Sequence, residues 1–460
     1  MYGLHLFFVV LIFLLLINLL KGERPRRTFT LLAYVLGLSF TNHLQTVLFF
    51  PTLLLLFLSC RKTWDLNRRT FGWAGFLFLL GLSPYLYLTI RSATGPLADW
   101  GATADWGNFI RHVSGWQYRI YMFAIPFEQA LKNGQAALQT VAFQLNWPFY
   151  LSFFGLFFFH RPGGKMLTAF GLYPIITLIY NAGYDIPDIE PYYLPVVLFY
   201  FYLVGAGALG WLWAAGNLKR MRSPAQAGIL LLLLLLTIYA PLSHWGRSDR
   251  SKYRFPQEAL ENIYQSAPNG GLVFTVVWDH YAPWLYHHFV LGKRPDLLML
   301  DVNLTNRSWY LDFLKRTQPE TLLGLEGRLD SLREMIRNFE RGLPFDTARI
   351  EADYRSMLAA LIRKNFSTRP LYFDVATESY AAAGWTLVPE GVLFRAYEKP
   401  GYYAYNIPSL GFSQTDNPAF LEDKLARREV ESSTWMLALR KNYERRYAPK
   451  ADGAGIAVPP

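Results

Sequence analysis

The chain has 460 residues, of which 52% are hydrophobic, and a formal net charge of +11. Apolar residues crowd the first half and charged residues reach an ordinary frequency only after Ser243, so the composition excludes a single soluble domain. Much of the positive charge lies in short loops between apolar runs, where it sets membrane topology. The sequence therefore predicts no nucleic-acid partner.

The first half predicts a polytopic α-helical membrane domain over residues 1–242. Residues 2–20 are apolar over a length that can cross a bilayer, and two shorter runs, 29–40 and 47–58, meet at His43. Basic clusters flank this pair on both outer sides, which places the turn at His43 on the external face. Further apolar runs complete a prediction of about eight membrane segments with both termini outside: 71–90, kinked at Pro84, 147–159, 166–180, 191–213 and 227–240.

Residues 91–141 are too long and too polar for a simple connection and predict an external loop. Its tryptophans and tyrosines, Trp100 among them, either anchor at headgroup level or contact sugar or lipid. Arg91, at the external end of a span, could pair with a lipid phosphate or simply extend into the headgroups. Residues 127–139 predict an interfacial helix.

Two polar turns between apolar runs are candidate substrate-binding positions. Asn42 and His43 could hydrogen-bond a phosphate or a sugar hydroxyl, although a bond between helices would satisfy them equally well. Asp185, Asp188 and Glu190 form a close group of carboxylates at an external membrane boundary. They could serve as general bases, hold a divalent ion at a phosphate leaving group, or form an ordinary solvated turn.

After Pro241 the pattern predicts an extracytoplasmic α/β domain over residues 243–447 and a disordered tail at 448–460. Trp278-Asp279-His280-Tyr281 directly follows a predicted strand, where sites gather in open α/β sheets. The domain contains no glycine-rich phosphate loop, no CxxC pair and no His-Glu metal motif. Helices are expected at 255–266, 281–290, 329–339 and 354–364, and strands at 271–277, 296–302, 369–373 and 391–396.

An ordered series of short motifs runs through nearly the whole chain. In the first half it comprises Tyr2-Gly3-Leu4-His5, Gly37-Leu38-Ser39 with Asn42-His43, 81–88 with Arg91, 96–101, and Asp185-Ile186-Pro187-Asp188 with Tyr193-Leu194-Pro195. In the second half it comprises Asp279, Arg294-Pro295-Asp296, Trp309-Tyr310 and 369–373. The series resembles glycosyltransferase family 117, also known as domain of unknown function 2723 and related to protein O-mannosyltransferases.

The resemblance implies a multi-pass GT-C glycosyltransferase of a bacterial inner membrane. Such an enzyme takes a sugar from a polyprenyl-phosphate carrier and passes it to a protein or glycan acceptor at the outer face. A general base deprotonates the acceptor hydroxyl, which attacks the anomeric carbon with inversion as the lipid phosphate leaves. His43, Arg91 and the Trp100 loop would hold the donor, with Asp185 and Asp188 next in line. Apart from the lipid-linked donor, no cofactor is assigned, although a divalent metal could take part.

In that family the segment at Tyr2 follows further spans and an external loop with an acidic catalytic motif. The resemblance therefore predicts a misassigned start, a fragment, or a copy that has lost the catalytic carboxylate, and the catalytic residue stays unknown. The alternative is a non-catalytic membrane protein, either a scaffold for envelope assembly or a carrier of polyprenyl lipid.

Overall fold

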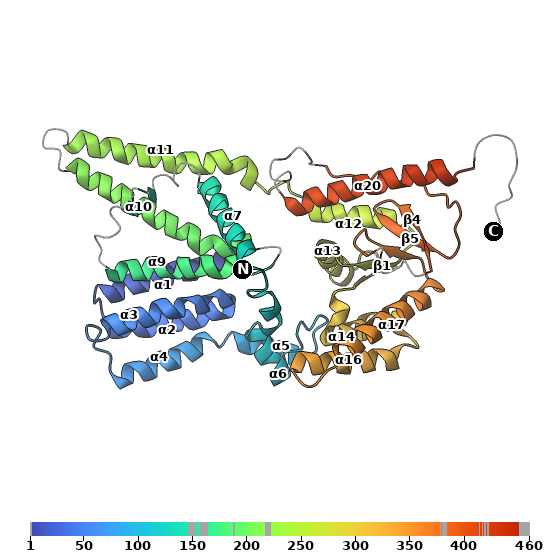
Figure 1. The fold of residues 1–460 in the computed structure, drawn as a ribbon, viewed down its shortest axis with the longest axis horizontal. Helices are drawn as coiled ribbons and strands as arrows, with labels where there is room; N and C mark the ends of the chain where they lie inside the picture. The colour runs from blue at the N-terminus through green and yellow to red at the C-terminus, as the bar shows by residue number, and fades with distance from the viewer. Residues whose placement is uncertain are drawn as a thin grey trace. The chain divides into compact units, whose positions relative to one another are not determined.

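The structure is a computed structural model that describes residues 2–145, 152–153, 155–156, 164–186, 189–216, 222–377, 379, 384–413, 415, 417, 420 and 423–449. The chain divides into two compact units, Met1–Ile238 and Tyr239–Pro460. The first unit is helical, and the second combines helices with a small mixed sheet (Figure 1). At this level the predicted fold class is confirmed. The predicted disordered tail lies almost entirely outside the described residues.

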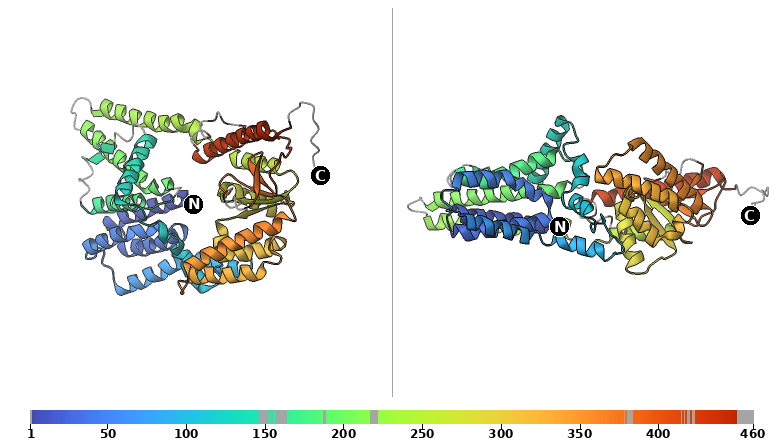
Figure 2. Two further views of the ribbon diagram at one scale, coloured as in Figure 1. Left: turned by 45° about the vertical axis from the view of Figure 1, so that its right-hand side comes forward. Right: turned by 90° about the horizontal axis from the view of Figure 1, so that it is seen from below.

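The first unit consists mainly of apolar helices, with the short elements α5, α6 and η2 between α4 and α7 (Figures 1 and 2). Its elements are α1 (Tyr2–Leu20), α2 (Pro25–Asn42), η1 (Leu44–Phe49), α3 (Phe50–Cys60), α4 (Arg68–Gly81), α5 (Tyr85–Ala93), α6 (Trp106–Val113), η2 (Trp116–Tyr121), α7 (Phe127–Leu145), α9 (Gly164–Ala182), η3 (Glu190–Tyr193), α10 (Leu194–Gly216) and the larger part of α11 (Arg222–Ser248), whose end from Tyr239 belongs to the second unit.

Three helices of the described chain are long and apolar enough to cross a membrane: Tyr2–Leu20, Glu190–Ala214 and Gln226–Gly246. The pair α4 and α5 would add a fourth span, bent by 41° at the break that contains Pro84. Shorter apolar helices cover two more of the predicted runs. The count of about eight segments stays a prediction, because most of the run at 147–159 lies outside the described residues.

Helices α2 and α4 approach each other closely at two glycines. A Cβ atom added at Gly37 would lie 2.3 Å from the Phe78 carbonyl oxygen, and one at Gly81 would lie 2.4 Å from the Tyr34 carbonyl oxygen. A residue with a side chain does not fit at either position unless the helices move apart. The contact holds the C-terminal half of α2, which leads into the turn at His43, against α4.

An aromatic core fixes η1 to its neighbours in the first unit. Phe49 stacks on Tyr173 of α9 with ring centroids 3.6 Å apart, and Phe13 of α1 packs edge-on against both rings. All three side chains are buried. Buried aromatic contacts of this kind hold the short helix that follows His43 against α1 and α9.

The sheet of the second unit has five strands in the order β2-β1-β3-β5-β4. β2, β1 and β3 run parallel, whereas β5 and β4 are antiparallel to their neighbours. The sequence pattern missed β4, which contains Pro389, because proline weakens the strand signal and is tolerated at a sheet edge. The strands are β1 (Gly271–Thr275), β2 (Leu297–Asp301), β3 (Leu371–Phe373), β4 (Thr386–Glu390) and β5 (Leu393–Tyr397).

Figure 1 shows α12 and α20 on one side of this sheet and α14, α16 and α17 on the other. The sequence predicted α12 in full and parts of α13, α16 and α17, but neither α14 nor α20. The helices are α12 (Phe255–Ser266), α13 (Trp278–Phe289), η4 (Leu304–Asn306), α14 (Ser308–Thr317), α15 (Pro319–Leu322), α16 (Glu326–Arg341), α17 (Thr347–Phe366) and α20 (Lys424–Tyr447).

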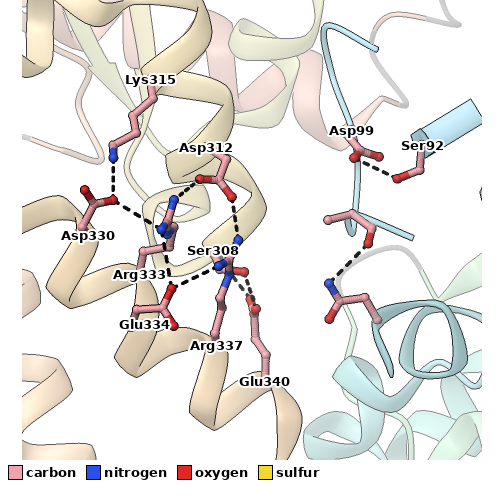
Figure 3. A network of polar contacts seen from close by, with 12 residues as sticks. Ser92, Asp99, Ser308, Asp312, Lys315, Asp330, Arg333, Glu334, Arg337 and Glu340 are labelled. Atoms are coloured by element: carbon pink, nitrogen blue, oxygen red, sulfur yellow. Dashed lines mark hydrogen bonds and ion pairs between the residues drawn. The ribbon is translucent and has the colours of Figure 1, made fainter. Parts of the chain in front are cut away.

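Charged side chains join α14 to α16 and seat α20 on the sheet. Arg333 and Arg337 of α16 both donate to the Asp312 carboxylate of α14, at 2.6 and 3.1 Å (Figure 3). Arg440 of α20 is fully buried and donates to the Pro389 carbonyl oxygen of β4 at 3.2 Å. A buried guanidinium is stable only when its N–H groups have acceptors. The bond from Arg440 to β4 therefore holds α20 against the sheet edge.

Candidate functional site

The turn at His43 ends one helix and begins the next. His43 adopts an extended backbone (φ −154°) after Asn42, and its N–H still donates to the Ser39 carbonyl oxygen. The Gln45 N–H donates to His43 Nδ1 at 3.3 Å, so the histidine side chain caps η1. In the neutral ring, Nε2 then carries the proton and can donate to a ligand.

Two buried hydroxyls hold this turn. The hydroxyl oxygens of Ser39 and Thr46 are 2.7 Å apart, and Thr46 donates to the His43 carbonyl oxygen at 2.9 Å. Both hydroxyls are therefore satisfied inside the protein. His43 itself is buried, with 8% of the residue exposed.

A second histidine comes from the first helix. His5 of α1 stacks on His43 with ring centroids 4.6 Å apart and an interplanar angle of 28°. His5 is 2% exposed, and neither of its ring nitrogens has a hydrogen-bond partner among the described residues. Burying an imidazole in this way costs its hydration. Polar groups at such a cost in an apolar helix bundle mark binding or proton-transfer sites.

The side chain of Gln45, next to the turn, and two residues from a distant part of the chain, Asn181 and Tyr192, complete the site. Tyr192 packs edge-on against His43 with ring centroids 4.9 Å apart. The Gln45 side-chain amide donates to Asn181 Oδ1 and to the Tyr192 carbonyl oxygen, both at 3.1 Å. Asn181 donates to the same carbonyl at 2.9 Å. We refer to the following residues as the histidine cluster: His5, His43, Gln45, Asn181 and Tyr192.

The predicted acidic turn adjoins the histidine cluster. Asp185 is exposed, and its backbone N–H donates to the Tyr121 carbonyl oxygen at 3.0 Å. The ring of Tyr184, the residue before it, lies 5.9 Å from that of Tyr192. Asp188 lies outside the described residues, so its position stays a prediction.

Arg91 and Trp100 belong to a second group at the end of α5. The exposed Arg91 guanidinium donates to the Thr94 hydroxyl at 3.0 Å, and Trp100 is 44% exposed. The Ser92 hydroxyl donates to Asp99 at 2.9 Å and ties the loop before Trp100 back to the helix (Figure 3). Within the described chain, no hydrogen bond joins Arg91 to the histidine cluster.

The segment from α5 to η2 nevertheless contacts the end of α2 and both polar turns. Tyr85 of α5 donates its hydroxyl to the Phe40 carbonyl oxygen near the end of α2, at 2.6 Å. A Cβ atom added at Gly115 would lie 3.0 Å from Leu44, which follows His43. The Gly115 contact with Leu44 and the backbone bond from Asp185 to Tyr121 place residues 115–121 beside the histidine turn and the acidic turn.

Four members of the histidine cluster were not identified as site residues from the sequence: His5, Gln45, Asn181 and Tyr192. His5 and Asn181 are polar residues within or directly after apolar runs, a signal that could have marked them. Tyr192 carries no such signal, because a tyrosine at a helix end is equally an ordinary membrane-interface residue.

The histidine cluster provides groups for binding. Imidazole N–H groups can donate to phosphate or sugar oxygens, and tyrosine rings can cover the apolar face of a sugar, whereas both N–H groups of the Gln45 amide already donate inside the protein. In the part of the chain that the structure describes, no group of three His, Cys, Asp or Glu residues could hold a metal ion. We therefore assign no metal ligand among these residues. We also name no catalytic residue.

Comparison with known proteins points to O-mannosyltransferases. A family model described as the N-terminal domain of protein O-mannosyl-transferase TMEM260 matches residues 1–66. The matched range contains His5, His43 and Gln45. No curated protein and no solved structure matches the chain. The match agrees with the predicted likeness to O-mannosyltransferases, whereas the assignment to glycosyltransferase family 117 stays a prediction.

Proposed function

We propose that this chain is a membrane glycosyltransferase of the O-mannosyltransferase type. In the proposed reaction, a hydroxyl of a protein or envelope acceptor attacks the anomeric carbon of a sugar carried on polyprenyl phosphate. The bond from that carbon to the phosphate oxygen breaks, and the acceptor proton passes to a general base. The reaction would take place at the outer face of a bacterial inner membrane.

One observation carries this proposal: the O-mannosyltransferase family model matches the stretch that contributes both stacked histidines. His5 and His43 are buried in a bundle of apolar helices, where imidazoles need polar partners. The phosphate of a lipid-linked sugar would supply acceptor oxygens for their N–H groups. We therefore assign the histidine cluster to the donor phosphate and first sugar.

An apolar cavity toward the other end of α1 suits the hydrocarbon part of such a donor. The cavity has a volume of about 260 Å³, and its lining consists of leucine, phenylalanine, alanine and tryptophan side chains from α1 to α4 and the loop before α4. Leu16, in its wall, lies three helical turns beyond His5, or roughly 16 Å along α1. A lipid with its phosphate at the histidine cluster could run its isoprenoid chain along this cavity.

The proposal is tested by measuring transfer from a labelled polyprenyl-phosphate sugar in membranes that contain the full-length gene product. We expect His43→Ala to lower transfer ~10-fold or more, because it removes a hydrogen bond to a charged phosphate. Asp188→Ala is the second variant. His287→Ala, a half-buried histidine of α13 in the second unit, is the matched control and should transfer at the wild-type rate.

If His43→Ala and Asp188→Ala both transfer at the wild-type rate, the site assignment is wrong.

The apolar cavity also fits the alternative function of a polyprenyl-lipid carrier. Binding of polyprenyl phosphate by the wild-type chain, with no transfer to any acceptor fraction, would favour that carrier over the enzyme.

A further inference from the structure

The second unit contains a topological switch point. From β1 the chain passes through α13 to β2, which lies on one side of β1 in the sheet. It then passes through the helices from α14 to α17 and reaches β3, which lies on the other side of β1. In open α/β sheets, ligands bind in the crevice at the carboxyl ends of the two strands that diverge in this way. Residues 276–280 and 374–376 follow β1 and β3 directly and lie at this crevice.

A cavity of about 300 Å³ lies at the crevice. Residues that follow β1 and β3 form its floor, and α12 and α20 form its walls. Its volume is at the lower end of the range for small-molecule sites. The apolar part of the lining includes Val277, Val392 and Phe412.

His280 and Asp374 are the buried polar groups of the floor. His280 is 7% exposed, and its Nδ1 atom lies 3.9 Å from Asp374 without a hydrogen-bond partner among the described residues. Asp374 instead accepts hydrogen bonds from the Thr275 hydroxyl at 2.5 Å and from the Ala376 N–H at 3.0 Å. The carboxylate is thus held by the strand ends, while one histidine nitrogen keeps its hydrogen-bonding capacity.

Two neighbouring carboxylates favour the protonated form of His280. Burial lowers the pKa of His280, but the carboxylates of Asp374 and Glu429 more than offset this effect and raise the pKa to about 9. His280 Nε2 donates to Glu429 of α20 at 3.0 Å. Both ring nitrogens therefore carry protons. Nδ1–H faces the Asp374 carboxylate at 3.9 Å, beyond hydrogen-bond distance, and can donate to a ligand oxygen.

Helix α20 brings further polar groups to the same cavity. Glu429 has a second carboxylate oxygen, and Ser432 and Ser433 contribute hydroxyl groups to the lining. Arg428 adds a guanidinium at the rim, exposed to solvent. Helix α20 thus contributes both hydrogen-bond donors and acceptors to the lining.

The charges at the cavity indicate the class of ligand. A phosphate or carboxylate ligand would meet Glu429 and Asp374, and an ammonium ligand would meet His280 and Arg428. Each charged class of ligand would therefore meet charges of its own sign in the lining, which disfavours its binding. A neutral ligand with several hydroxyls can donate to the carboxylate, accept from the histidine and arginine, and place its carbon face on the apolar side.

We propose that this cavity binds a neutral, hydroxyl-rich ligand of the size of one sugar unit. The site lies within the second unit and uses none of the histidine cluster, so it does not depend on the proposed transferase reaction.

The test measures binding of methyl glycosides of glucose, mannose, galactose and N-acetylglucosamine to the full chain in nanodiscs free of sugar detergents. Glucosamine and glucuronate serve as the cationic and anionic comparators. We expect at least one neutral glycoside to bind, and Glu429→Gln to weaken it ~10-fold because a hydrogen bond to a charged group is lost. Glu431→Gln, on the exposed side of the same helix, is the matched control.

A second variant covers the case in which Glu429→Gln unfolds. Ser433→Leu fills the cavity from the side of α20. We expect this variant to abolish binding of the neutral glycoside. The proposal is overturned if no neutral glycoside binds, if only a charged comparator binds, or if both variants bind as the wild type does. His43→Ala should leave this binding unchanged even where transfer is lost, which separates the two sites.

Discussion

Replacing His280 by glutamine should remove a pH-dependent contribution to the stability of the second unit. His280 is buried between two carboxylates, and its pKa in the folded chain, about 9, lies above its ordinary value of 6.5. The proton on His280 therefore stabilises the fold fully below about pH 6.5, and this contribution is lost as the pH rises through about 9. Glutamine keeps a donor for Glu429 but does not titrate.

The size of the effect follows from the same two values. A pKa raised from 6.5 to about 9 corresponds to about 3 kcal/mol of stabilisation at low pH. We expect the difference in unfolding free energy between wild type and His280→Gln to shrink by about this amount between about pH 6 and pH 10. Asp374, whose carboxylate accepts four described hydrogen bonds, stays ionised throughout this range because the pKa of that carboxyl is lowered.

The assay is urea unfolding of the full chain followed by pulse proteolysis, with detection of fragments from the second unit. The matched control is His287→Gln. Burial lowers the pKa of His287, so its substitution should not reproduce the loss of stability near pH 9. A difference between wild type and His280→Gln that is constant across the whole pH range would refute the assignment of a protonated, carboxylate-paired histidine.

The remaining predictions concern the first unit. Gly37→Ala should destabilise it by about 1–3 kcal/mol, because the new methyl group meets the α4 backbone; Gly72→Ala, which meets nothing within 4 Å, should be nearly neutral in the same unfolding assay. Impermeant thiol reagents should reach a cysteine placed at Gly95 but not one at Gly163, in a chain whose own Cys60 is buried. The opposite labelling pattern would invert the predicted topology.

Local patterns in the sequence determined the type and approximate extent of many elements. The contrast between apolar runs and charged stretches separates the helical membrane part from the part with a sheet, because burial in lipid and burial in a protein core demand different compositions. The helix break at His43 and the bend near Pro84 are also local, since a change of backbone dihedrals or a lost hydrogen bond produces each.

Tertiary packing alone decided which polar groups meet. His5 stacks on His43, Gln45 reaches Asn181 across 136 residues, and His280 reaches Glu429 across 149. Periodicity reports which face of an element is buried and contains no record of its partner. The choice of partner follows from the aromatic core that holds η1 and from the arginine that seats α20, so neither site could be assembled from the sequence pattern.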